Sequence, residues 1–190
     1  AQYNYDNRYF ASASYRRDAS SYFAKDHRWG SFWSVGGAWI MSKEKWFNAP
    51  FVDELKLKAS IGQQGNDNIG AFAYTDLYTI TPNAAGNGMS PSFYRMGNDK
   101  ITWETTTNLN VGVEFSLWKS RLTGSVDVYS KKTSDLLFWL SIPESQGTRG
   151  YYGNLGDIRN SGIELVLSAA IIRTKDIDWN ITANLSHNST

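Results

Sequence analysis

Residues 108–117 read NLNVGVEFSL and decide the fold class of this chain. An apolar side chain stands at every odd position, and a polar or small residue stands at every even position. Because successive side chains of a β-strand point to opposite faces, this alternation predicts a strand with one apolar and one polar face. A tilted strand needs about 9 to 11 residues to cross the hydrocarbon of a membrane, whereas soluble strands average about 5 to 6 residues. The length of the stretch therefore favours a membrane-spanning strand.

The same alternation recurs on both sides of this stretch. It is clean from Trp179 to Leu185, an apolar row occupies the odd positions from Ile163 to Ile171, and the alternation is poor from Trp33 to Met41. We expect about seven antiparallel strands, near residues 7–17, 29–41, 53–61, 101–117, 121–133, 158–172 and 177–187. The predicted fold class is all-β, as a segment of an antiparallel transmembrane β-barrel.

The connections between the predicted strands alternate in length. Three are short, at residues 43–51, 119–120 and 174–176, and three are long, at residues 18–28, 62–100 and 134–157. In an antiparallel sheet every second connection lies at the same end, so the short turns share one end and the long loops share the other. Outer-membrane barrels have this polarity, with short periplasmic turns and longer extracellular loops.

Tryptophans lie close to the ends of the predicted strands. Those near the short turns are Trp39, Trp46, Trp118 and Trp179, and those near the long loops are Trp29 and Trp103. An amphipathic indole ring suits the lipid headgroup level, so this placement indicates two aromatic girdles. The alternative is that these rings are ordinary core or interface aromatics.

A sheet inside a membrane has to close on itself, because backbone amides cannot stay unpaired in hydrocarbon. The smallest single-chain barrels have about eight strands, so about seven strands cannot close alone. We therefore expect further strands outside these 190 residues. The polar side chains expected to face the wet interior are Asn110, Glu114, Asp127, Asn180 and Asn184.

The composition argues against several other classes of protein. The 19 Lys and Arg residues and the 18 Asp and Glu residues are scattered, so no basic patch predicts nucleic-acid binding. The absence of cysteine excludes disulfides and thiolate metal sites. The longest unbroken apolar run, from Leu136 to Leu140, is far shorter than the roughly 20 residues of a membrane-spanning helix.

Residues with catalytic or metal-binding chemistry form no recognisable site in the sequence. His27 and His187 lie in different segments, and neither has partners at metal-ligand spacing. Asp26 beside His27 lacks the nucleophile elbow that would accompany a triad. Residues 65–68, GNDN, offer oxygen atoms to Ca²⁺ but suit a tight turn better. We predict that the chain is not an enzyme and binds no metal or cofactor.

A succession of local phrases extends over residues 7–188. The phrases are YRRDASS (15–21), RWG (28–30), LKLKAS (55–60), GNDNIG (65–70), TWETTTN (102–108), DVYSKKTSDLL (127–137), PESQG (143–147) and NLGDIRNSGIE (154–164). Their order and approximate spacing resemble the barrel of SusC/RagA-family TonB-linked outer-membrane proteins. Ala19 stands where the family usually has glycine, and Asp67 stands where glutamine is common. These departures concern loop turns and leave the strand pattern intact.

The resemblance implies that residues 1–190 are part of a single barrel domain in the outer membrane of a Gram-negative cell. Barrels of this family have about 22 strands and a plugged lumen. The resemblance implies active import of large nutrients, either glycans or peptides. It also implies three partners: outer-membrane lipid, a SusD-like surface lipoprotein, and the TonB–ExbB–ExbD complex. The plug and the TonB-contacting segment are expected outside these residues.

The long loops contain the candidate substrate-binding residues. These are the aromatic residues Tyr74, Tyr78, Tyr94, Trp139, Tyr151 and Tyr152. Exposed aromatic rings near polar groups can stack on sugar rings or on peptide side chains. The alternative is that the rings pack the loops against one another.

Two other functions fit parts of the pattern. A passive porin-like or structural barrel would have the same strands, but it would have no plug. A soluble carbohydrate-binding β-sandwich would also alternate apolar and polar positions, because one face of each of its sheets is buried. In that case, the apolar rows would pack against a second sheet.

Overall fold

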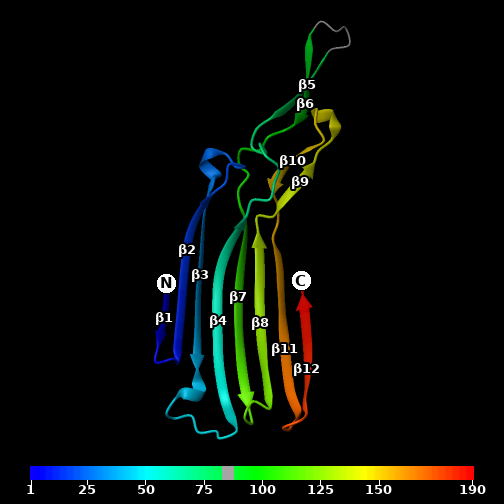
Figure 1. Ribbon diagram of the computed structural model, residues 1–190. Helices are drawn as coiled ribbons and strands as arrows, with labels where there is room; N and C mark the ends of the chain where they lie inside the picture. Colours follow the sequence, from blue (N-terminus) through cyan, green and yellow to red (C-terminus); the bar gives the residue numbers. More distant parts are fainter. Residues whose placement is uncertain (83–87) are drawn as a thin grey trace.

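Eight strands form one antiparallel sheet in the computed structural model, which describes residues 1–82 and 88–190 (Figure 1). The strands are β1 (Gln2–Tyr5), β2 (Tyr9–Ala19), β3 (Trp29–Ile40), β4 (Val52–Asn66), β7 (Glu104–Leu117), β8 (Leu122–Ser134), β11 (Ile158–Arg173) and β12 (Asp178–Ser189). Each strand pairs with the next one in this order, so the sheet runs up and down without a crossover. This is the strand order of an antiparallel barrel wall.

All seven predicted strands are present in this sheet, and the predicted number is one too low. The missed strand is β1, which forms a hairpin with β2. Its turn contains Asp6 and Asn7, which both have positive φ values, of 52° and 48°. Asp and Asn tolerate this backbone conformation, and paired positive φ angles match the twist of a two-residue hairpin. The four residues of β1, QYNY, do alternate polar and aromatic side chains, but so short a run is at the lower limit of a strand signal.

The strand ends differ from the predicted ones where the alternation gives no signal. β4 continues five residues beyond residue 61, through a polar segment that pairs with the start of β7. Conversely, β7 begins at Glu104 rather than at residue 101. Ile101 is fully buried in the loops and belongs to their packing.

Two small hairpins lie within connections that the sequence predicts only as loops. β5 (Leu77–Pro82) pairs with β6 (Met89–Arg95), and β9 (Leu137–Ser141) pairs with β10 (Gly150–Asn154). The remaining elements are three single 3-10 turns, η1 (Lys25–His27), η2 (Met41–Lys43) and η3 (Glu144–Gln146). In the described part of the chain, no helix combines the length and the apolar character needed to cross a membrane. The predicted connection 62–100 includes residues 83–87, which lie outside the described ranges.

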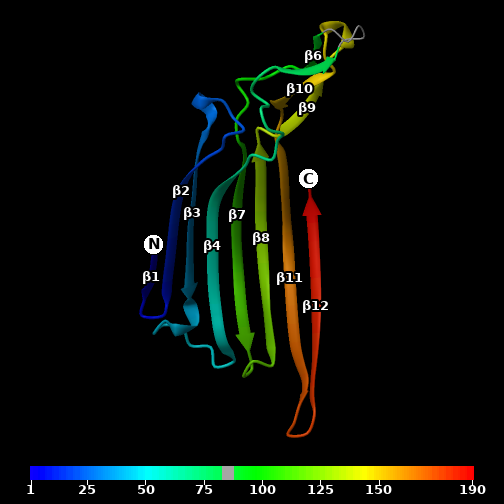
Figure 2. The ribbon, with the colours of Figure 1, turned by 45° about the horizontal axis from the view of Figure 1, so that its top comes forward.

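The two ends of the sheet differ as predicted. The turns β1–β2, β3–β4, β7–β8 and β11–β12 lie at one end, and the two small hairpins extend beyond the other end (Figures 1 and 2). We call these the turn end and the loop end.

The apolar side chains of neighbouring strands lie side by side in register. One such row runs from Leu57 through Val113, Val126 and Leu165 to Leu185. The sheet is a single layer (Figures 1 and 2), and no second sheet covers these rows within residues 1–82 and 88–190. This arrangement argues against a β-sandwich, in which such rows would be buried.

Candidate functional site

The three long loops fold together onto a small apolar core at the loop end. Phe23, Ile69, Ala73 and Ile101 are buried there, and Trp103 packs against them. Phe23 follows β2, Ile69 and Ala73 follow β4, and Ile101 and Trp103 follow β6. Leu137 and Tyr152, from the loop after β8, cover the same core. The loops therefore form one folded unit above the sheet.

Side-chain hydrogen bonds to the backbone connect segments that are distant in the sequence. The Trp103 indole donates to the Arg28 carbonyl at 3.2 Å. The Asn154 side chain accepts from the Thr102 amide at 2.9 Å and donates to the Thr102 carbonyl at 2.9 Å. The Asn98 amide group donates to the Tyr152 carbonyl at 3.0 Å. The Asn154 side chain thereby satisfies both backbone groups of Thr102, which lies between strands.

A hollow of about 740 Å³ lies between the two small hairpins, and we call it the loop hollow. Its lining residues are Thr79, Ser92, Phe93, Tyr94, Arg95, Trp139, Glu144, Gly147, Thr148, Arg149 and Tyr152. In Figure 2, β6, β9 and β10 gather beyond the loop end of the sheet. The volume is within the range of about 300 to 1,000 Å³ that is usual for ligand pockets.

The structure brings three of the six predicted aromatic residues together in this hollow. Tyr94, Trp139 and Tyr152 line it, and the rings of Trp139 and Tyr152 meet edge to face at 5.1 Å. Trp139 and Tyr94 expose 42% and 64% of their surface, which leaves their rings free to contact another molecule.

The other three predicted residues lie outside the hollow. Tyr78 is exposed, and its ring lies 5.2 Å from that of Phe93. Tyr74 packs against the loop core. Tyr151 is half-buried in β10, opposite Leu140 of β9.

Sequence reasoning missed the charged and hydroxyl groups of the loop hollow. Arg95, Glu144, Thr148 and Arg149 lie far apart in the chain, and only the packing of the hairpins brings them to one place. The phrase SFYR at residues 92–95, with a single arginine after two aromatic residues, was the one available signal.

The polar face of the sheet carries a ladder of charges across three strands. The Lys58 ammonium lies 2.9 Å from a carboxylate oxygen of Glu114 and 2.9 Å from one of Asp127. Lys56 binds the other Glu114 oxygen at 3.0 Å. The strand register places Asn184 on the same face, as predicted. A hollow of about 710 Å³ opens on this face, lined in part by Lys58 and Asp127.

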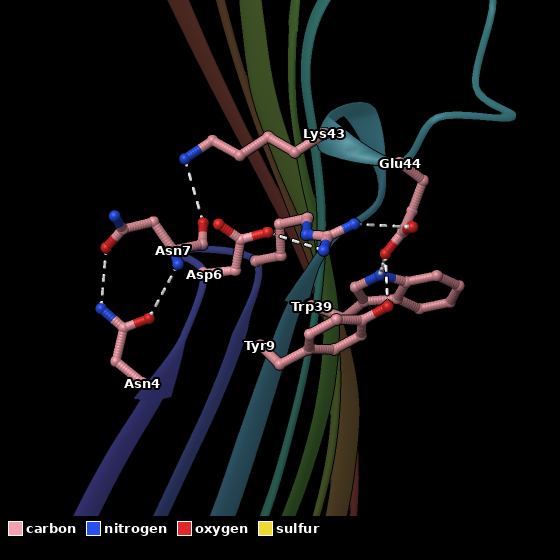
Figure 3. Close-up of polar contacts among 8 residues, drawn as sticks. Asn4, Asp6, Asn7, Tyr9, Trp39, Lys43 and Glu44 are labelled. Carbon is pink, nitrogen blue, oxygen red and sulfur yellow. Dashed lines mark hydrogen bonds and ion pairs between the residues drawn. The ribbon is translucent and has the colours of Figure 1, made fainter.

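A polar cluster at the turn end connects the β1–β2 hairpin to the β3–β4 turn (Figure 3). Glu44 accepts hydrogen bonds from the Tyr9 hydroxyl and from the Trp39 indole, the latter at 3.1 Å. Arg8 lies 3.2 Å from Glu44 and 2.6 Å from Asp6. The hydrogen bond from Tyr9, followed by that from Trp39 and the charge of Arg8, lowers the pKa of Glu44 below its ordinary value.

Two further contacts complete this cluster. Lys43 donates to the Asn7 carbonyl at 3.0 Å, and the Asn4 side chain binds the Asn7 side chain at 2.8 Å (Figure 3). The cluster therefore fixes the short β1 strand, which has few backbone partners of its own. Apart from the Arg8 Nε, which meets no acceptor among the described residues, its groups bind one another, and this arrangement indicates a structural role.

Metal-binding side chains do not gather within residues 1–82 and 88–190, where no group of three or more His, Asp or Glu residues could hold an ion. His27 lies in η1 at the loop end, and His187 lies in β12. The two predicted turn residues Asn66 and Asn68 form a local bond, in which the Asn68 amide donates to the Asn66 side chain at 3.1 Å. This is the Asx geometry of a tight turn.

Comparison with known proteins identifies the barrel. The family model described as "TonB dependent receptor-like, beta-barrel" matches residues 1–190. TonB-dependent receptor P39 of Formosa agariphila is 37% identical over 98% of this chain and 18% of its own length. TonB-dependent receptor SusC of Bacteroides thetaiotaomicron is 34% identical over 98% of this chain and 19% of its own length. The chain thus spans about a fifth of these relatives.

Solved structures agree with this assignment. The RagAB peptide importer in its closed-closed state matches with a TM-score of 0.91 at 30% identity, over 98% of this chain and 21% of that one. The siderophore receptor PirA of Pseudomonas aeruginosa matches with a TM-score of 0.62 at 14% identity, over 99% of this chain and 33% of that one, which shows the shared fold alone.

The apolar rows of the sheet now have a physical explanation, because the outer surface of an outer-membrane barrel contacts hydrocarbon. The charged ladder lies on the opposite face and lines the interior. The chain belongs to the TonB-dependent receptor-like β-barrel family and forms a SusC/RagA-type stretch of an outer-membrane barrel.

Proposed function

We propose that this chain supplies part of the wall and outer loops of an active importer of large nutrients, either glycans or peptides. The observation that carries the proposal is the division of one sheet into three surfaces. Its apolar rows suit lipid, its charged ladder suits a wet lumen, and its loop end forms a folded unit with a hollow. A transporter wall needs all three surfaces.

The proposed importer is a barrel of about 22 strands with a plug in its lumen. Energy reaches the plug from the TonB–ExbB–ExbD complex through a region outside these residues. The charged ladder of Lys56, Lys58, Glu114 and Asp127 gives the lumen a polar wall against which a plug can slide or rearrange. Residues 1–190 then lie within a single barrel domain.

A SusD-like surface lipoprotein is the proposed partner at the loop end. The similarity to SusC and to the RagAB peptide importer supports this pairing. The hairpins β5–β6 and β9–β10 extend beyond the sheet and are the parts of this chain placed to meet such a partner (Figure 1). Substrate released by the lipoprotein would reach the loop hollow first.

Energy dependence of uptake tests the proposed function. Whole cells with the full-length transporter should accumulate labelled oligosaccharide or peptide, and a protonophore or deletion of TonB should abolish the accumulation. A passive barrel would equilibrate the same solute at an unchanged rate after either treatment, and that result would overturn the proposal. Co-purification of a SusD-like lipoprotein with the full-length transporter tests the partner, with a transporter lacking residues 77–95 as the control.

A further inference from the structure

A buried arginine without an acidic partner stands in the wall of the loop hollow. Arg95, the last residue of β6, is only 9% exposed and lines the hollow. One of its terminal nitrogens donates to the Ala71 carbonyl at 3.0 Å, and its guanidinium carbon lies 5.3 Å from the centre of the Tyr152 ring. Within residues 1–82 and 88–190, its Nε meets no acceptor and no carboxylate pairs with it.

Removal of a charged group from water is unfavourable unless an opposite charge or several hydrogen bonds compensate for the lost hydration. One carbonyl and one aromatic face supply only part of that compensation for Arg95. The other two charged residues of the hollow, Glu144 and Arg149, lie 3.2 Å apart and are both well exposed, so they neutralise each other. The uncompensated charge of the hollow is therefore the positive charge of Arg95.

The surroundings of Arg95 favour a ligand that combines an anion with a ring or an apolar segment. Tyr94 and Trp139 expose ring surface at the hollow, and the Tyr152 ring contacts both the Trp139 ring and the guanidinium. The Thr148 hydroxyl, also in the lining, is bound only at 3.4 Å or more to backbone carbonyls. A carboxylate can pair with a guanidinium while the neighbouring part of the ligand lies on the rings.

We propose that the loop hollow binds a carboxylate group of the imported nutrient, with Arg95 as its counter-charge. The carboxylate can belong to a uronic acid in an oligosaccharide or to an acidic side chain in a peptide. This inference rests on the proposed function, because it assumes that nutrients reach the loop end. It adds the chemical class of the imported nutrient, because it predicts that acidic nutrients are preferred to neutral ones of the same size.

Binding of matched acidic and neutral probes to the full-length transporter, purified in detergent, tests the inference. The probes are trigalacturonate with its methyl ester, and a glutamate-rich hexapeptide with its glutamine counterpart. The wild-type protein should bind one acidic probe about tenfold or more tightly than its neutral counterpart, which is the scale of a charge-assisted hydrogen bond. The pair that shows this preference identifies the source of the carboxylate.

Variants at two arginines separate the buried charge from the exposed one. Arg95→Gln should remove the preference for the acid and leave binding of the neutral probe unchanged, and Arg95→Lys should retain part of it. Arg159→Gln is the matched control, because Arg159 is an exposed arginine of β11 outside the lining of the loop hollow, and this variant should retain the full preference. Heat-modifiable electrophoresis establishes that each variant is folded. If Arg95→Gln does not fold, the inference is tested by the binding of the acidic and neutral probes to the wild-type protein and to Arg95→Lys.

Three results would overturn the inference: no binding of either acidic probe, equal binding of the acid and its neutral counterpart in both pairs, or a preference that persists in Arg95→Gln. The proposed function fails by a different result. Uptake that is unchanged by the protonophore contradicts active import, whatever the binding preference. Conversely, energised uptake of neutral and acidic nutrients at equal affinity contradicts only the role of Arg95.

Discussion

The wall and the loop end place their apolar side chains in opposite ways. In the wall, Val111, Val128 and Ile163 lie in one row and expose 50%, 52% and 45% of their surface. At the loop end, Phe23 and Ile101 are fully buried. The wall therefore depends on lipid to cover it, whereas the loop end covers itself as a small soluble protein does.

The backbone bonding of the two regions differs as well. The strands of the wall satisfy one another through continuous ladders, such as that between β7 and β8. The loop end depends on specific side chains, including Trp103, Asn98 and Asn154, for many of its backbone partners. A mutation in the wall should therefore act through contact with lipid, and a mutation at the loop end should act through packing or through a single lost hydrogen bond.

The largest expected effect is the loss of the loop core. Phe23→Ala removes a buried ring that packs 5.4 Å from Trp103, and such truncations cost about 3 to 5 kcal/mol. The cost should fall mainly on the loops, because Phe23 packs among loop residues and the sheet reaches them through Phe32 of β3, whose ring meets Trp103 at 5.3 Å. Limited proteolysis of intact cells should show faster cleavage within the long loops while the barrel remains inserted. Tyr22→Ala, at an exposed neighbour, is the control and should leave cleavage unchanged.

A charge on the lipid face should have the next largest effect. Val126→Arg places a cation in the middle of an apolar row, and the cost at the bilayer midplane is about 2 to 4 kcal/mol. Ser125→Arg is the matched control, because it lies one residue away on the polar face, opposite Glu114. Urea unfolding of the full-length protein in lipid vesicles measures the free energy of unfolding of both variants. Equal losses of stability in the two variants would contradict the assignment of the faces.

Removal of the central cation of the charged ladder should have a smaller effect. Lys58→Met leaves Glu114 and Asp127 without their shared partner, and partly exposed ion pairs contribute about 0.2 to 1 kcal/mol each. The loss should shrink as the salt concentration rises, because salt screens the remaining repulsion. Lys131→Met, on the same face and without an ion pair among the described residues, should change nothing. A loss that is independent of salt would point to packing instead.

The smallest expected effect is confined to the β1–β2 hairpin and depends on pH. The pKa of Glu44 is lower in the folded protein than in the unfolded chain, so Glu44 stabilises the fold fully above its unfolded pKa. That stabilisation disappears as the pH falls through the folded pKa. Amide exchange of residues 1–8, corrected for the intrinsic effect of pH, should therefore accelerate in acid. In Glu44→Gln, the amides of residues 1–8 should exchange quickly at every pH. If their exchange in this variant still accelerates in acid, another group is responsible.

The sequence by itself determined the wall. Alternation is a property of neighbouring residues, so it revealed seven of the eight strands, their faces and the polarity of their connections. The alternation failed to predict strand residues in the part of the sheet where no lipid contacts one face. The segment from Gln63 to Asn66 pairs with Thr107 and its neighbours as a strand, but it is polar on both faces. A row that includes Thr107 and Lys132 lies beyond the apolar rows, where no lipid selects an apolar side chain.

Only the tertiary structure decided the loop end. The bond between Trp103 and Arg28 joins residues 75 positions apart, and no periodic pattern encodes such a contact. The same packing brings Arg95 to Tyr152 and places Tyr74 against the loop core, outside the lining of the loop hollow. The physical reason is that a strand is specified by local alternation and backbone bonding, whereas a hollow is specified by side chains that meet only after the loops have folded.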